Sequence, residues 1–171
     1  LRMRQDLVLM ESKFTREAME VFEKIENYGN PWGMSSQDRE KWTEGMDIPV
    51  MREKGSAEYL YWAGCSGAYD DRGKDISRSV AKIMKKAEVD FAILGNEETC
   101  TGDSARRIGN EYLFQMQADQ NIQNFEKYNA CTLWFQGLLM KKFSSSAATR
   151  SCAPMTIAMN ISVSYTHLTL P

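Results

Sequence analysis

The chain has 171 residues and a mass of 19.6 kDa, with 43% hydrophobic and 26% charged residues. This composition is typical of one globular domain, or one domain with an appendage, and excludes collagenous and mucin-like chains. The net charge of −2 and the isoelectric point near 5.6 argue against nucleic-acid and anionic-membrane partners. No apolar run approaches the ~20 residues that span a bilayer. Because the chain begins with Leu1, we expect a fragment of a longer protein.

Acidic residues are distributed unevenly along the chain. All 23 lie in residues 1–129, whereas residues 130–171 contain neither Asp nor Glu. Such an abrupt change marks a domain boundary, a targeting segment or sequence that is not native. We interpret residues 130–171 as an aberrant, non-native tail that derives from a frameshift or from adapter sequence.

A helical lead-in is predicted for residues 1–56. Apolar residues recur at helical spacing through residues 14–28, where Thr15 can cap the first turn. The glycine- and proline-containing segment 29–33 then ends this helix. A shorter helix is expected to begin after Ser35. The lead-in carries no catalytic motif.

From residue 57 the pattern changes to alternating strands and helices. Apolar runs at 59–63 and 91–94 predict two buried strands, and a helical pattern at 103–128 follows them. The helix between the strands shows an apolar stripe of Ile76, Val80, Ile83, Met84 and Ala87. This order predicts a right-handed parallel β-α-β unit, and therefore an α/β architecture.

A third strand should begin at Asn129, where the aberrant tail begins instead. Without that strand the parallel sheet would be truncated and would keep an open edge. Open edges pair with other chains, so we expect a marginally stable or aggregating chain.

Two cysteines follow the two predicted strands, Cys65 after the first and Cys100 after the second. The carboxyl ends of adjacent parallel strands meet at one edge of a sheet, so both thiols should lie on the same rim. Thiolates on such loops can ligate an iron–sulfur cluster or zinc. The simpler interpretation is that each cysteine is a small buried apolar residue. A disulfide is disfavoured because nothing indicates an oxidising compartment.

Other chemistries fit this segment less well. Arg72 follows Cys65 one residue too late for a phosphatase loop, and the glycines do not complete a dinucleotide-binding loop. The single histidine, His167, lies in the tail, which argues against a Cys-His couple. We interpret the acidic pairs at 70–71 and 97–98 as solvated loop charges rather than as acid/base pairs.

Several segments together resemble a known family. They are Tyr61-Trp-Ala-Gly-Cys65, Asn96-Glu-Glu-Thr-Cys-Thr-Gly-Asp103 and Arg106-Arg-Ile-Gly-Asn-Glu-Tyr112, with lead-in segments at 7–11, 30–33, 38–39 and 42. They resemble the cysteine-rich (CCG) domain of heterodisulfide-reductase-like iron–sulfur oxidoreductases. The resemblance covers about residues 5–129.

The resemblance implies electron transfer through a cysteine-ligated 4Fe-4S cluster in the intact parent protein. It makes Cys65 and Cys100 metal ligands and implies that Gly64 and Gly102 let the backbone approach the cofactor. It implies redox partner proteins, an upstream ferredoxin-type domain and a membrane cytochrome b-like part. The implied location is cytoplasmic, with membrane association through parts that this chain lacks.

This sequence departs from the family pattern at two points. Thr101 stands where the second cysteine of a Cys-Cys pair belongs, and no Cys-x-x-Cys follows, since Cys131 and Cys152 are twenty-one residues apart. Two thiolates fall short of the four ligands of such clusters. The alternatives are therefore a degenerate, cluster-free repeat that serves as a scaffold or interaction domain, and a structural zinc site. We expect this chain alone to be inactive, with no cluster bound.

The resemblance also suggests a division of the chain. Residues 1–56 would lead in from the missing ferredoxin-type domain, 57–129 would form a partial CCG-type α/β domain, and 130–171 would be the tail. Arg106 and Arg107 would place positive charge near an anionic cluster, or would be solvated surface residues.

Overall fold

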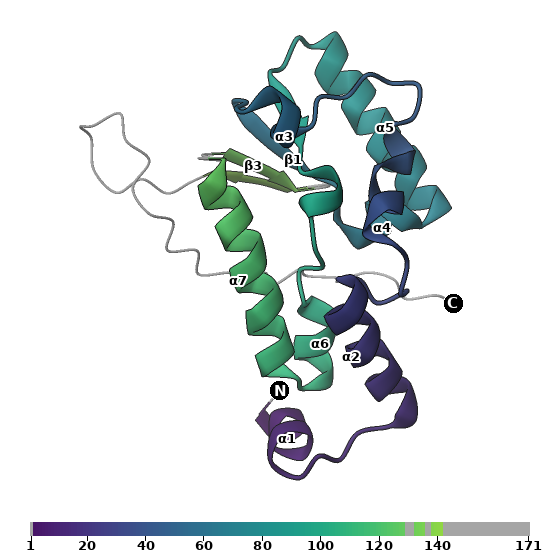
Figure 1. Ribbon diagram of the computed structural model, residues 1–171, viewed down its shortest axis with the longest axis vertical. Coiled ribbons are helices and arrows are strands. Elements are labelled where there is room, and N and C mark those ends of the chain that lie inside the picture. The colour runs from purple at the N-terminus through teal and green to yellow at the C-terminus, as the bar shows by residue number, and fades with distance from the viewer. Residues whose placement is uncertain (1, 129–131, 136–137, 142–171) are drawn as a thin grey trace, which may run out of the picture.

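The computed structural model describes residues 2–128, 132–135 and 138–141. Cys131, Cys152, His167 and most of the proposed tail lie outside the described residues. Helices surround a small sheet, with the long helices α5 and α7 on different sides of it (Figure 1).

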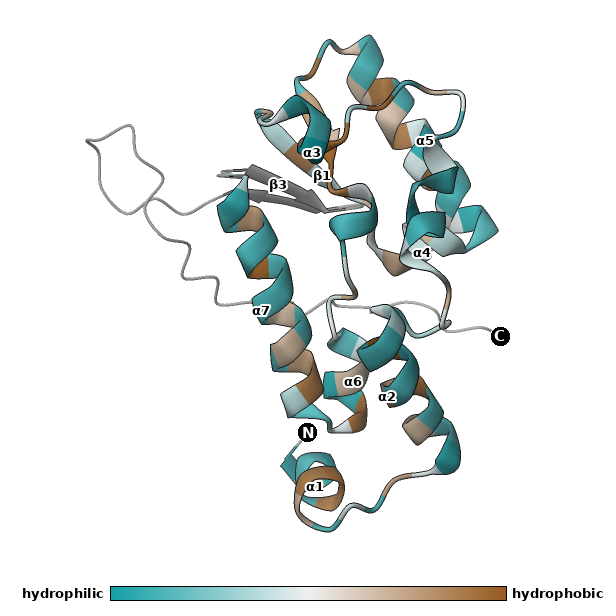
Figure 2. Ribbon diagram, in the orientation of Figure 1, coloured by the Kyte–Doolittle hydropathy of each residue, from teal (hydrophilic) through white to brown (hydrophobic). Residues whose placement is uncertain are grey.

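The lead-in forms the first four elements. They are α1 (Arg2–Gln5), the π-helical turn η1 (Asp6–Met10), α2 (Arg16–Tyr28) and the 3₁₀ helix η2 (Ser36–Thr43). The predicted helix at 14–28 is confirmed in α2, where the Thr15 hydroxyl accepts a bond of 3.3 Å from the Ala18 amide. Gly29, in the left-handed conformation, ends the helix. The apolar run of η1 stands out at the lower end of Figure 2, and Met10 in it is 80% exposed.

The sheet has four strands in the order β2-β1-β3-β4. Its strands are β1 (Tyr59–Trp62), β2 (Phe91–Ile93), β3 (Thr132–Phe135) and β4 (Leu138–Lys141). The helices that precede and connect the first two strands are α3 (Met51–Lys54), α4 (Gly64–Tyr69) and α5 (Asp71–Lys86). Strands β1 and β2 pair in parallel, as do β1 and β3, whereas β3 and β4 are antiparallel. The prediction of an α/β architecture is confirmed in this coarse form, a helix-rich chain with parallel strands.

Alternation along β1 builds two apolar layers. Tyr61 packs with Phe91 and with residues of α5 on one face of the sheet. Leu60 and Trp62 point to the other face, where the Trp62 ring lies 5.4 Å from the ring of Phe125 in α7. A sheet covered on both faces explains why the predicted strands are continuously apolar.

The buried face of α5 differs from the predicted stripe. Ile76 and Ile83 are 46% and 68% exposed, whereas Ser77, Ala81 and Met84 are buried. Small residues face the sheet because the aromatic side chains of β1 and β2 fill the space between the layers. The predicted stripe is therefore right for Met84 and for Val80, which packs against this layer, and wrong for Ile76 and Ile83.

The predicted helix at 103–128 is interrupted. It forms α6 (Asp103–Ile108) and α7 (Glu111–Lys127), separated by Gly109 and Asn110. Gly109 has φ +123°, and a Cβ atom there would lie 2.5 Å from the carbonyl oxygen of Arg4. The Asn110 side chain then caps α7 by accepting a 3.0 Å bond from the Leu113 amide.

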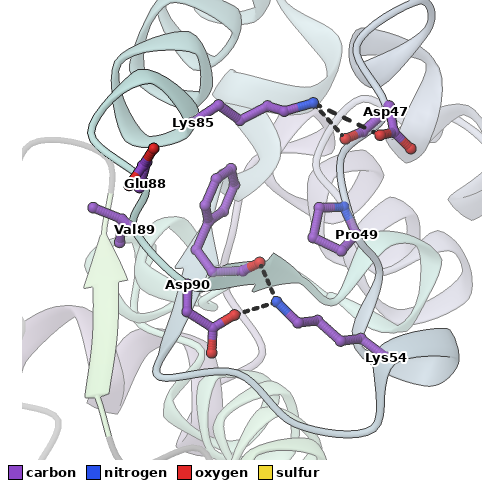
Figure 3. A pocket seen from close by; sticks show the side chains of 8 residues that line it. Asp47, Pro49, Lys54, Lys85, Glu88, Val89 and Asp90 are labelled. Atoms are coloured by element: carbon purple, nitrogen blue, oxygen red, sulfur yellow. Dashed lines mark hydrogen bonds and ion pairs between the residues drawn. The ribbon is translucent and has the colours of Figure 1, made fainter.

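The expectation of a missing third strand is wrong, because β3 pairs with β1. The outer edge of β2 is also partly covered, since the Ile93 amide donates to the Pro49 carbonyl at 3.0 Å. Lys54 reaches the Asp90 carboxylate and donates to the Phe91 carbonyl at 3.4 Å (Figure 3). Because Pro49 and Lys54 occupy part of the β2 edge, this edge is less open to pairing with a second chain, and the predicted marginal stability or aggregation stays a prediction.

Candidate functional site

The two cysteines predicted to share a rim lie together. Cys65 occupies the first turn of α4, directly after β1, and Cys100 lies just before α6, after β2. The two thiols lie close enough to influence each other's pKa, and both residues contact the Gly29 carbonyl, which accepts from the Cys100 amide at 2.7 Å and from the Cys65 thiol at 4.0 Å. Cys100 is buried and Cys65 is partly exposed. Cys65 packs against both the layer around Tyr61 and the cluster that contains Cys100.

The pKa values of the two thiols shift in opposite directions. The interaction with Cys65 lowers the pKa of Cys100 below its ordinary value, with the Gly102 amide and Arg39 acting in the same direction against burial. The same interaction, together with burial, raises the pKa of Cys65. The two thiols therefore titrate as a pair, and their surroundings favour the thiolate form of Cys100 over that of Cys65.

A buried ion pair lies beside the thiols. The side chains of Arg39 and Glu98 are only 2% and 3% exposed, and Nη1 lies 2.8 Å from Oε1. Arg39 Nη2 donates to the Cys65 sulfur at 3.4 Å. Burial raises the pKa of Glu98 to about 7, although Arg39 opposes this shift. The interpretation of residues 97–98 as solvated charges is therefore wrong for Glu98.

The loop after α2 completes one wall of the site. The side chain of Asn30 is fully buried and makes four bonds with the backbone of residues 28–34, which fixes the turn. The Gly29 carbonyl then accepts bonds from the Cys100 amide at 2.7 Å and from Arg39 Nη2 at 3.3 Å. The lead-in thus forms part of the cysteine site.

Asn121 of α7 holds the other side of the Cys100 loop. Its Oδ1 accepts from the amide and the hydroxyl of Thr99, and its Nδ2 donates to the Cys100 carbonyl at 2.9 Å. Asn121 is completely buried. A polar side chain in this position is tolerated because its donor and acceptor groups are both bonded.

The two predicted glycines have separate structural roles. The Gly64 amide donates to Glu98 Oε1 at 2.8 Å. Gly102 has φ +76°, and a Cβ atom there would lie 2.9 Å from the Cα atom of Phe114. Its amide donates to the Cys100 sulfur at 3.4 Å. Glycine at 102 is thus required by the close approach of α7, while its N–H serves the thiol.

Three other residues from the sequence analysis lie away from the sulfurs or are engaged with other groups. The Thr101 hydroxyl accepts from the Asp103 amide at 3.5 Å, at the start of α6. Arg106 pairs with Glu111 and Arg107 with Asp103. The positive charge beside the thiols comes from Arg39 instead.

Two hollows are present among the described residues. One, of about 500 Å³, lies at the amino end of β2 and is lined by Lys54, Lys85 and Asp90 (Figure 3). The other, of about 780 Å³, lies between α2 and α7. Gly29, Glu98 and Thr99, which surround the cysteine loop, also line this second hollow. The second hollow is therefore the one that adjoins the candidate site.

Comparison with known proteins agrees with this geometry. Residues 59–134 match the model of the CCG family, described as a cysteine-rich domain. Residues 59–134 are a CCG cysteine-rich domain. The match includes β1, β2, both site cysteines and most of β3.

Curated relatives of this chain are named as oxidoreductases or reductases, and one of them is named as iron–sulfur-binding. The chain is 44% identical over 132 residues to the probable iron-sulfur-binding oxidoreductase FadF of Bacillus subtilis, covering 73% of this chain and 19% of that protein. It is 39% identical over 133 residues to the EtfAB:quinone oxidoreductase of Syntrophomonas wolfei, covering 75% and 19%. Identity to a subunit of the dihydromethanophenazine:CoB--CoM heterodisulfide reductase of Methanosarcina barkeri is 22% over 148 residues, covering 85% and 34%. No solved structure matches.

The chain spans about a fifth of the length of the first two relatives. Within its described residues, no helix is long and apolar enough to cross a membrane. The general iron–sulfur and oxidoreductase character of the relatives agrees with the resemblance of the sequence.

The donor set of the CCG domain fits a thiolate-bound metal centre in part. Cys65 and Cys100 supply two adjacent sulfurs, and two N–H donors point at them. Among the described residues, no group of three or more His, Cys, Asp or Glu side chains surrounds a common point. The described residues therefore account for two of the four ligands that iron–sulfur clusters take.

Sequence reasoning missed four residues of the site: Gly29, Arg39, Glu98 and Asn121. Arg39 lies in a short polar helix with no apolar periodicity, and Asn121 lies within a long helix, where asparagine has no local role. The Asn-Pro-Trp-Gly sequence at 30–33 was a usable signal, because a buried turn asparagine commonly organises the preceding loop.

Proposed function

We propose that this chain is part of an iron–sulfur oxidoreductase of the heterodisulfide-reductase-like type. In the intact parent, Cys65 and Cys100 would help to hold a 4Fe-4S cluster that passes electrons between redox partners. When bound, the cluster supplies the electron-transfer chemistry, and the residues of this chain fix its ligands and balance their charge. The names of the relatives support the general iron–sulfur redox role.

The observation that carries the proposal is the contact between the two thiols. Two cysteines separated by 34 residues in the sequence bring their sulfurs close together, and the Gly102 amide and the Arg39 guanidinium donate to these sulfurs. Donors aimed at sulfur stabilise the thiolate form, which is the form that ligates metals. Two inert apolar cysteines would have no need of a buried guanidinium.

A degenerate repeat that serves as a scaffold is the second candidate, and Thr101 favours it. Its hydroxyl accepts from the Asp103 amide at the start of α6, a local contact that needs no metal. This alternative predicts a folded domain that binds no iron. A structural zinc site on the same two sulfurs is the third candidate, and the metal analysis below distinguishes it from the other two.

We also propose the organisation of the parent. Residues 1–56 would connect this domain to an upstream ferredoxin-type domain, and a membrane cytochrome b-like part would complete the electron path. The protein would be cytoplasmic or membrane-associated through those parts. The pairing of β3 with β1 and of β4 with β3 favours a domain that extends to residue 141, so a non-native tail would begin after it rather than at 130. The parallel pairing of β1 and β2 supports a right-handed crossover through α5.

Metal analysis of the intact parent tests the function. The parent is purified without oxygen, then assayed for iron, acid-labile sulfide and zinc, and compared with a variant in which Cys65 and Cys100 are both replaced by serine. Iron and sulfide that fall in matching amounts in the variant are expected if this domain holds a cluster. A fall in zinc alone would indicate the structural zinc site, and an unchanged metal content in folded protein would contradict cluster binding and favour the scaffold role.

A further inference from the structure

Arg39 is the charged residue most deeply integrated into the cysteine site. It lies in η2, in the lead-in, and reaches the rim formed by the ends of β1 and β2. Its side chain is 2% exposed. Burying a guanidinium is costly unless its charge is paired, so a surface role does not account for its position.

The contacts of Arg39 are directed and use separate parts of the guanidinium. Nη1 binds Glu98, Nη2 donates to the Gly29 carbonyl and to the Cys65 sulfur, and Cζ lies 5.1 Å from the ring centre of Tyr69. Its Nε atom is buried without a hydrogen-bond partner. Glu98, Gly29 and Tyr69 therefore fix the orientation of the planar guanidinium. In this orientation Nη2 also donates to the sulfur of Cys65.

The site needs positive charge as soon as its thiols ionise. Two thiolates in contact, or an anionic centre held by them, concentrate negative charge where solvent is largely excluded. Glu98 adds to the negative charge but is already engaged by Arg39 and by the Gly64 amide. Lysine could not replace Arg39 fully, because its single ammonium lacks the planar fork.

We propose that Arg39 is the positioning and charge-compensating residue of the cysteine site. It holds the Cys65 sulfur through a hydrogen bond and balances the charge of the thiolates, whether or not they carry a metal centre. For a bound cluster the inference rests on the proposed function. In that case the positive charge of Arg39 raises the reduction potential of the cluster. For the metal-free chain it stands independently.

The test compares two alkylating reagents on the metal-free chain. Iodoacetate is an anion and iodoacetamide is neutral, and both react with the same thiolate. We measure the rate of iodoacetate divided by the rate of iodoacetamide at Cys65, by mass spectrometry at fixed pH. Both rates depend equally on the fraction of ionised thiol, so this ratio is independent of that fraction and reports the local charge. In Arg39→Met we expect this ratio to fall about tenfold, because one positive charge leaves the immediate surroundings of the sulfur.

Three further variants make the result specific. Arg39→Lys keeps the charge and should keep the ratio within about twofold of the wild type. Arg106→Met removes an arginine of α6 that pairs with Glu111 and should leave the ratio unchanged. If Arg39→Met does not fold, the double variant Arg39→Met with Glu98→Gln removes both buried charges and is compared with Glu98→Gln alone, so that the two proteins differ only in the Arg39 charge, and the ratio is expected to fall between them.

An unchanged ratio in a folded variant that lacks the Arg39 charge would overturn the inference. So would an equal fall in Arg106→Met. A second readout applies to protein loaded with iron and sulfide, where Arg39→Met should lower the reduction potential and Arg39→Lys should largely preserve it. If the wild type takes up no iron, the proposed function fails, and the alkylation ratio still decides the role of Arg39.

Discussion

Replacement of Glu98 by glutamine probes the electrostatics of the cysteine site most sharply. The substitution keeps the shape of the side chain but leaves the Arg39 guanidinium without its carboxylate. At the observed 2.8 Å and an effective dielectric constant near 20, the attraction between unit charges is about 6 kcal/mol. Part of this offsets the desolvation of both groups. At a pH above 7, where the Glu98 carboxyl is ionised, we therefore expect Glu98→Gln to lower the free energy of unfolding by up to about 3–5 kcal/mol, and the loss should shrink as the pH falls through about 7.

The assay is equilibrium unfolding of the metal-free chain in a chemical denaturant. Glu20→Gln is the matched control, because Glu20 pairs with Arg16 on the exposed surface of α2 and should change stability by less than about 1 kcal/mol. The double variant Glu98→Gln with Arg39→Met should recover much of the loss, since it leaves no unpaired buried charge. A loss below about 1 kcal/mol for Glu98→Gln would refute the buried pair.

Three further predictions concern other parts of the structure. Gly102→Ala should destabilise the chain by about 2–3 kcal/mol in denaturant unfolding, through its positive φ and its contact with α7, whereas Gly45→Ala, with open space around it, should cost about 1 kcal/mol. Asn121→Ala should cost about 2–3 kcal/mol and lower iron uptake, because it frees the loop of Cys100, and uptake equal to the wild type would contradict this. The hydrogen bonds from Arg52 lower the pKa of Glu40, so the stability from this pair is present above the ordinary carboxyl pKa and is lost as the pH falls through the lowered value. The free energy of unfolding of Glu40→Gln should therefore approach that of the wild type only at low pH. A difference between the two proteins that does not depend on pH would contradict a stabilising Glu40–Arg52 pair.

Local signals in the sequence predicted the elements that depend on local contacts. The Thr15 cap and Gly29 define α2, and the apolar runs define β1 and β2. The placement of Cys65 and Cys100 on one rim followed from the parallel arrangement of strands alone. Each of these features needs only residues close in sequence or a general rule of topology.

Long-range contacts account for what the sequence could not predict. The break at Gly109 results from the approach of Arg4, more than a hundred residues away in the sequence. Arg39 and Glu98 are 59 residues apart and look like ordinary surface charges until the fold buries them together. The strand β3 was missed because the change of composition at residue 130 suggested that the domain had already ended.

The central claim is that Cys65 and Cys100 together hold a metal centre. The most direct test measures iron and acid-labile sulfide in the anaerobically purified intact parent protein and in its Cys65→Ser and Cys100→Ser variants. We predict that iron and sulfide fall in matching amounts in both variants, because each variant removes one of the two sulfurs that lie on the rim of the sheet. Iron and sulfide contents that stay at the wild-type level in both variants would contradict the claim.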